Sequence, residues 1–141
     1  MSLNDAQQFF AAYREAFNRL DGDAVADLWH VSSGIADISN GVGRLTWWTD
    51  DAPMRANHNA LCDVYRHNGY DHADFDIVDH LPLGDNHGFS RLHWTLWRGD
   101  GSVLQQFHTA YQLIRTAEGP RVLMATAYEE YIREMKHHAA Q

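Results

Sequence analysis

The ten-residue segment LHWTLWRGDG, residues 92–101, joins the pattern of a β-strand to that of a tight turn. Apolar side chains occupy alternate positions from Leu92 to Leu96, which is the period of a strand with one buried face. The Asp100-Gly101 pair is the strongest short-range signal for a hairpin turn. The segment therefore predicts an antiparallel hairpin with the β-branched and aromatic stretch that follows it.

The hairpin also predicts which side chains share a face of the sheet. A two-residue turn at Asp100-Gly101 would pair Trp94 with Phe107 and His93 with His108. Because side chains alternate between faces, the core face is predicted to carry Leu92, Trp94, Leu96, Phe107, Thr109, Tyr111 and Leu113. The outer face mixes polar and large apolar groups, which suits a subunit interface, and carries Arg91, His93, Thr95, Trp97, Gln106, His108 and Gln112.

The rest of the chain divides into a helical half and a strand-rich half. The first half favours helices at residues 4–20, 23–30 and 52–67, with a short strand at 33–39 and a turn at 40–43. Strands are predicted at residues 72–83, 89–98, 103–115 and 121–131. Helices segregated from an antiparallel sheet indicate an α+β fold. We expect residues 1–141 to form a single domain, since no linker or repeat interrupts them.

Composition and charge exclude several classes of partner. The chain has 141 residues, of which 45% are hydrophobic and 21% charged, enough apolar material for a globular core. Its formal charge of -8 and its scattered arginines disfavour nucleic acid and anionic membranes. One cysteine excludes an internal disulfide framework and a zinc cluster built on thiolates. Without a membrane-length apolar run or a signal peptide, we expect a cytoplasmic location.

Two early segments add to this pattern. The segment FFAAYREAFN (residues 9–18) reads as an opening helix, and LDGDAVADLW (residues 20–29) as an acidic Gly-Asp break before a second helix. With residues 92–101, their order and spacing resemble the SnoaL-like families of the nuclear transport factor 2-like superfamily over nearly the whole chain. The resemblance implies a cone-shaped barrel, with three N-terminal helices packed on a strongly bent, mainly antiparallel sheet around an apolar cavity. It also implies a homodimer formed through the outer sheet face.

The resemblance leaves several functions open, since one fold hosts many. The same scaffold carries ketosteroid isomerases, polyketide cyclases, enzymes similar to scytalone dehydratase, and binding modules. One hypothesis is a cofactor-independent acid–base enzyme (isomerase, cyclase or dehydratase) that acts on a small hydrophobic cyclic substrate. The alternative is a non-catalytic module that binds a hydrophobic ligand or only dimerises. A subunit of a larger oxygenase is a third reading, by resemblance alone.

Asp37 and Tyr13 are the candidate catalytic residues. Asp37 lies in a short predicted strand, where the resemblance places the catalytic aspartate of the ketosteroid isomerases, and an aspartate beside an apolar cavity can serve as a general base. Those enzymes follow it with proline, whereas Ile38 stands here. Tyr13 corresponds to their oxyanion-binding phenol. The structural alternatives are a solvated aspartate and a core tyrosine.

The histidines offer one candidate pair. His93 and His108 would face each other across the hairpin, as a possible acid–base pair or a polar pair at a subunit interface. The register places them on the outer face, away from the expected cavity. His58 and His67, on the third predicted helix, have no metal-binding spacing. No metal site is predicted.

Aromatic residues are the candidate ligand-binding groups. They suit a planar hydrophobic molecule, although bulky core filling explains most of them equally well. The predicted set is Phe17, Trp48, Trp94, Phe107, Tyr111 and Tyr128.

Overall fold

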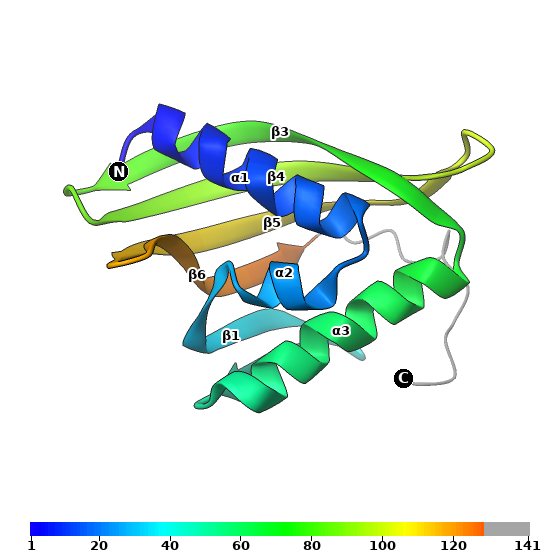
Figure 1. Ribbon diagram of the computed structural model, residues 1–141, viewed down its shortest axis with the longest axis horizontal. Coiled ribbons are helices and arrows are strands. Elements are labelled where there is room, and N and C mark those ends of the chain that lie inside the picture. Colours follow the sequence, from blue (N-terminus) through cyan, green and yellow to red (C-terminus); the bar gives the residue numbers. More distant parts are fainter. Residues whose placement is uncertain (129–141) are drawn as a thin grey trace.

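The computed structural model describes residues 1–128 and shows three helices on a six-stranded curved sheet (Figure 1). The elements are α1 (Leu3–Asn18), α2 (Gly22–Ala26), β1 (Trp29–Ser39), β2 (Val42–Trp48), α3 (Asp51–His67), β3 (Tyr70–Leu83), β4 (His87–Arg98), β5 (Val103–Thr116) and β6 (Gly119–Tyr128). The strand order is β2-β1-β6-β5-β4-β3, so the sheet does not close on itself. Among the strand pairs within residues 1–128, only β1–β6 is parallel. The predicted α+β class is confirmed.

The region between the first and third helices differs from the prediction. The second helix ends at Ala26, not near residue 30, because Trp29 already belongs to β1. A second strand, β2, follows a turn at Asn40-Gly41, whose φ angles of 54° and 77° are those of a tight hairpin turn. This strand was not predicted, because β2 lies at the edge of the sheet and has almost no buried side chains to show a two-residue period.

The other strands lie close to their predicted positions. The last strand, expected at 121–131, runs from Gly119 to Tyr128; the rest of that prediction, from residue 129, lies outside the described residues.

The predicted register of the β4–β5 hairpin is confirmed. Trp94 pairs with Phe107, and His93 pairs with His108. The turn itself was predicted wrongly. The register shifts between Leu96 and Trp97, so a bulge beside the loop absorbs one residue. The pairs farther along the hairpin keep their register, and with it their faces.

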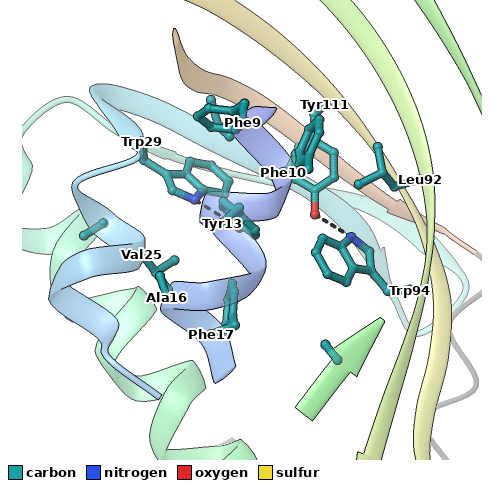
Figure 2. Packing of buried hydrophobic residues seen from close by; sticks show 14 of the residues in the cluster. Phe9, Phe10, Tyr13, Ala16, Phe17, Val25, Trp29, Leu92, Trp94 and Tyr111 are labelled. Carbon is teal, nitrogen blue, oxygen red and sulfur yellow. Dashed lines mark hydrogen bonds between the residues drawn. The ribbon is translucent and has the colours of Figure 1, made fainter. Parts of the chain in front are cut away.

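Helix α1 supplies much of the core. Ser2 and Asp5 form a capping box at its start, in which each side chain accepts a hydrogen bond from the other residue's backbone N–H. Phe10, Tyr13 and Phe17 then recur at three- and four-residue spacing, and their side chains pack between the helix and the sheet (Figure 2). None of the helices within residues 1–128 is long and apolar enough to cross a membrane.

Candidate functional site

A cavity of about 460 Å³ lies between the helices and the inner face of the sheet. Apolar and aromatic side chains form most of its wall, among them Phe17 of α1, Leu61 of α3 and Trp94 of β4. Alternate residues of the strands reach the cavity because only one face of the sheet points inward. This combination of apolar walls and a few polar groups is typical of a small-molecule site.

Two phenol hydroxyls in the cavity wall accept hydrogen bonds from tryptophan side chains. Trp29 Nε1 donates a hydrogen bond to the Tyr13 hydroxyl at 3.2 Å, and Trp94 Nε1 donates to the Tyr111 hydroxyl at 3.0 Å (Figure 2). Burial is the main cause that raises the pKa of both phenols above its ordinary value. Both therefore stay protonated at neutral pH, and each keeps its own O–H as a hydrogen-bond donor.

Asp37 also lines the cavity, but it is not an isolated carboxylate. It faces Arg44 across the β1–β2 hairpin, and Arg44 Nε and Nη2 donate to its two oxygens at 2.9 and 2.8 Å. The Asp37 side chain is 23% exposed and that of Arg44 56% exposed, so the pair is in contact with solvent. A general base at Asp37 would have to act while bound by this guanidinium.

His58 lines the cavity, although the sequence did not predict a role for it there. It is 1% exposed, and neither ring nitrogen has a hydrogen-bond partner among the described residues. Its ring lies 4.4 Å from the Trp29 ring, measured between centroids. Burial, followed by the positive charge of Arg55, lowers the pKa of His58 to about 4, so the imidazole is neutral at neutral pH. The available signal was its position between Met54 and Cys62 on the buried face of α3.

Gln105 is a second cavity residue that the sequence analysis did not single out. It is 3% exposed and lines the cavity from β5, directly opposite Leu96 of β4. No hydrogen bond joins its side-chain amide to another described residue. The face alternation that placed Phe107 inward also places Gln105 inward, so the pattern could have identified it.

Most of the predicted aromatic set lies at the cavity, but two members do not. Phe17, Trp94, Phe107 and Tyr111 line it. Trp48 is instead packed in the core, with its ring 6.0 Å from that of His58. Tyr128 lies on the other face of the sheet, where its hydroxyl accepts a hydrogen bond from Arg91. These two placements correct the prediction, because residues 48 and 128 fall outside the alternation that fills the cavity.

A known protein-family model matches most of the sequence. Residues 4–130 match the family model described as NTF2-like protein (DUF6841). The chain belongs to this NTF2-like family. No curated protein sequence matches it.

Solved structures share the NTF2-like fold with this chain at low sequence identity. An NTF2-like protein of unknown function from Shewanella oneidensis is 19% identical, with a TM-score of 0.68, over 90% of this chain and 98% of that one. A domain of unknown function with a cystatin-like fold from Nostoc punctiforme is 12% identical, with a TM-score of 0.69, over 99% and 82%. A ketosteroid isomerase-like protein from Erwinia carotovora atroseptica is 14% identical, with a TM-score of 0.63, over 86% and 90%. These likenesses establish the cone fold.

The outer face of this NTF2-like sheet holds the histidine pair. The rings of His93 and His108 are 4.8 Å apart, and the His108 ring stacks on Tyr128. Neither histidine lines the cavity. Their face is therefore the predicted one, and an acid–base role at the cavity is not open to them.

Metal binding has little support in the described part of the chain. Within residues 1–128, no three histidine, cysteine, aspartate or glutamate side chains gather in a way that could hold a metal ion. Cys62 is buried, which raises the pKa of its thiol to about 11 and keeps it protonated.

Proposed function

We propose that this protein binds a small, mainly apolar molecule in the cavity between its helices and the sheet. The observation that carries the proposal is the cavity itself, about 460 Å³ in volume with predominantly apolar walls. Concave, mainly apolar pockets of this size are the usual form of a small-molecule site. Trp29 and Trp94 in the wall offer flat surfaces for a cyclic ligand.

Filling the cavity tests this proposal. Ala127 lines the cavity from β6, so Ala127→Phe would place a ring in the space that the ligand needs. Thr126 is its exposed neighbour on the opposite face, and Thr126→Phe adds the same ring outside the cavity. Binding of substituted benzenes and naphthalenes, followed by tryptophan fluorescence, should weaken at least tenfold only in Ala127→Phe. Equal binding by both variants, or no binding of any probe by the unmodified protein, would overturn the proposal.

Acid–base conversion of the bound molecule is the second candidate function. Asp37 and Tyr13 support it, since a carboxylate and a phenol both line the cavity. The bidentate bond from Arg44 counts against Asp37 as a free base and favours simple binding. In a screen of cyclic ketones and hydroxy-aromatic compounds, Asp37→Asn should abolish any turnover, whereas Asp50→Asn at an exposed helix cap should not. An unchanged rate in Asp37→Asn would rule out Asp37 as the base.

Assembly through the outer sheet face also remains a proposal. Ile38, Leu45 and Trp47 lie on the face of the β1–β2 hairpin opposite the cavity, and they are 61%, 62% and 44% exposed. An apolar cluster of this kind suits a second copy of the chain. Sedimentation should show a dimer for the unmodified protein and a monomer for Trp47→Glu. A monomer in both cases would remove the proposal.

A further inference from the structure

Gln105 and His58 are two neutral polar side chains in the mainly apolar wall of the cavity, which also carries hydroxyl groups such as those of Tyr13 and Tyr111. Each is more than nine-tenths buried, and neither makes a side-chain hydrogen bond to the described residues. They come from different elements of the wall, Gln105 from strand β5 and His58 from helix α3. Buried amide and imidazole groups are nearly always hydrogen-bonded, because leaving one unsatisfied costs free energy. Two such groups around one cavity indicate partners that enter it from outside.

We propose that the cavity selects an uncharged cyclic molecule carrying a hydroxyl group, and that Gln105 anchors this hydroxyl while His58 offers a second hydrogen-bonding point. The inference rests on the proposed binding function and specifies its ligand. A hydroxyl both donates and accepts. It can therefore form a hydrogen bond with either the N–H or the acceptor atom of an amide or a neutral imidazole. A carbonyl can pair only with the N–H.

The charges around the cavity explain why the ligand is uncharged. Within residues 1–128, Asp37 and Arg44 are the only formally charged residues that line it, and they form an ion pair with each other. His58 is neutral at neutral pH. A carboxylate or ammonium group deep in the cavity would lose its hydration without gaining an opposite charge. A neutral polar group avoids that cost.

The two groups differ in how they can reach a ligand. His58 has almost no exposed surface, and the Trp29 ring packs 4.4 Å from its ring, so its nitrogens become accessible only if neighbouring side chains shift. Gln105 has a longer side chain with three rotatable bonds and can turn its amide toward a ligand without moving the backbone. Gln105 is therefore the primary anchor, and its substitution is the decisive one.

A matched pair of substitutions and a matched set of probes test the inference. Gln105→Met keeps the length of the side chain but removes its donor and acceptor, and an apolar residue at a buried position should not impair folding. Gln106→Met makes the same change on the opposite face, where residue 106 pairs with Thr95. The probes are 4-ethylphenol, 4-ethyltoluene, which replaces the hydroxyl with a methyl group, and 4-ethylbenzoate, which is an anion. Dissociation constants are measured by calorimetry at pH 7.

We expect Gln105→Met to lose most of the preference for 4-ethylphenol over 4-ethyltoluene. The ratio of the 4-ethyltoluene to the 4-ethylphenol dissociation constant should fall about tenfold in Gln105→Met and stay unchanged in Gln106→Met. The anion should bind the unmodified protein more weakly than the phenol. The Gln105 amide NMR signals should shift with the phenol and not with the toluene. His58→Gln should retain more of the discrimination than His58→Phe, because glutamine keeps a donor and an acceptor.

Different results would contradict the binding function and the selection of a hydroxyl group by Gln105. If the phenol and the toluene bind, but with a ratio that Gln105→Met leaves unchanged, the hydroxyl inference is wrong and the binding function stands. Tightest binding by the benzoate overturns the inference in the same way. If no probe binds the unmodified protein, both proposals fall.

Discussion

Trp29 Nε1 and the Tyr13 hydroxyl form a hydrogen bond of 3.2 Å that ties the start of β1 to the middle of α1 inside the core. Both residues are buried, at 4% exposure each. The bond joins two elements whose side chains line the same cavity, so it fixes part of the cavity wall as well as the core.

Removal of the Tyr13 hydroxyl should destabilise the protein. In Tyr13→Phe, the Trp29 N–H loses its acceptor in the core, and we expect the free energy of unfolding to fall by about 1–2 kcal/mol. Urea denaturation measures the change. Tyr128→Phe is the control, because its hydroxyl is bonded to Arg91, which also pairs with Asp79, and the loss there should stay below about 0.5 kcal/mol. Equal losses in the two variants would contradict the role given to the Trp29 bond.

His58 should make stability depend on pH. Its pKa is about 4 in the folded protein and near 6.5 when exposed, so the unfolded chain binds more protons between these values. Stability should therefore fall as pH decreases from about 6.5 to about 4, by about 3 kcal/mol from this group. This contribution should vanish in His58→Phe, whereas His67→Phe, at an exposed position of the same helix, should keep it. Denaturation curves measured across this pH range test the prediction. If stability depends on pH equally in His58→Phe and in the unmodified protein, the His58 imidazole is not strongly desolvated.

Gly34 should not tolerate a side chain. A Cβ atom at this position would lie 2.5 Å from Trp47 Cε3 and 2.8 Å from the backbone oxygen of Thr46. We expect Gly34→Ala to lower the free energy of unfolding by about 1–3 kcal/mol, since either the ring or the strand must move. Gly43→Ala in the same hairpin meets nothing within 4 Å and should be nearly neutral. Thermal unfolding compares the two, and a neutral Gly34→Ala would show that the hairpin adjusts freely.

Cys62 should react slowly while the protein is folded. Burial raises the pKa of its thiol to about 11 from an ordinary value of 9.0, so the reactive thiolate is scarce at pH 8. Modification by a chromogenic disulfide reagent should be at least about 100-fold slower than in denaturant, where the thiol is exposed. Because Cys62 is the only cysteine, the signal has a single source. Similar rates in both conditions would place the thiol at the surface.

The sequence predicted the central strands β4 and β5 but not the edge strand β2. Alternation from Leu92 to Leu96 predicted the buried face of β4, because a half-buried strand must place its apolar residues on one face. The register of β4 and β5 was predicted from the Asp100-Gly101 turn, and it holds because a bulge beside the loop absorbs the difference in turn length. Edge strand β2 carries almost no buried residues, so its sequence lacked that period. Its one local signal was Asn40-Gly41, read as a turn without the strand that follows it.

The candidate site shows the limit of sequence reasoning. Asp37 and Tyr13 were placed at the cavity by family resemblance, and the structure has both in its wall. The pairing of Asp37 with Arg44 depends on the register of a strand that the sequence analysis did not predict. Gln105 drew no attention because glutamine is common at exposed positions, and only the inner face of the sheet makes it unusual.

The sequence by itself determined the class of fold, because the periods of the helices and strands follow from local stereochemistry and from the need to bury one face of each. The tertiary structure alone decided which polar groups meet the cavity without a hydrogen-bond partner in the described part of the chain. His58 and Gln105 come from segments far apart in the chain, and α3 and β5 bring them to a shared space where neither side chain finds a hydrogen-bond partner among residues 1–128. No local pattern encodes such a property, because it depends on every neighbour that could have supplied a partner.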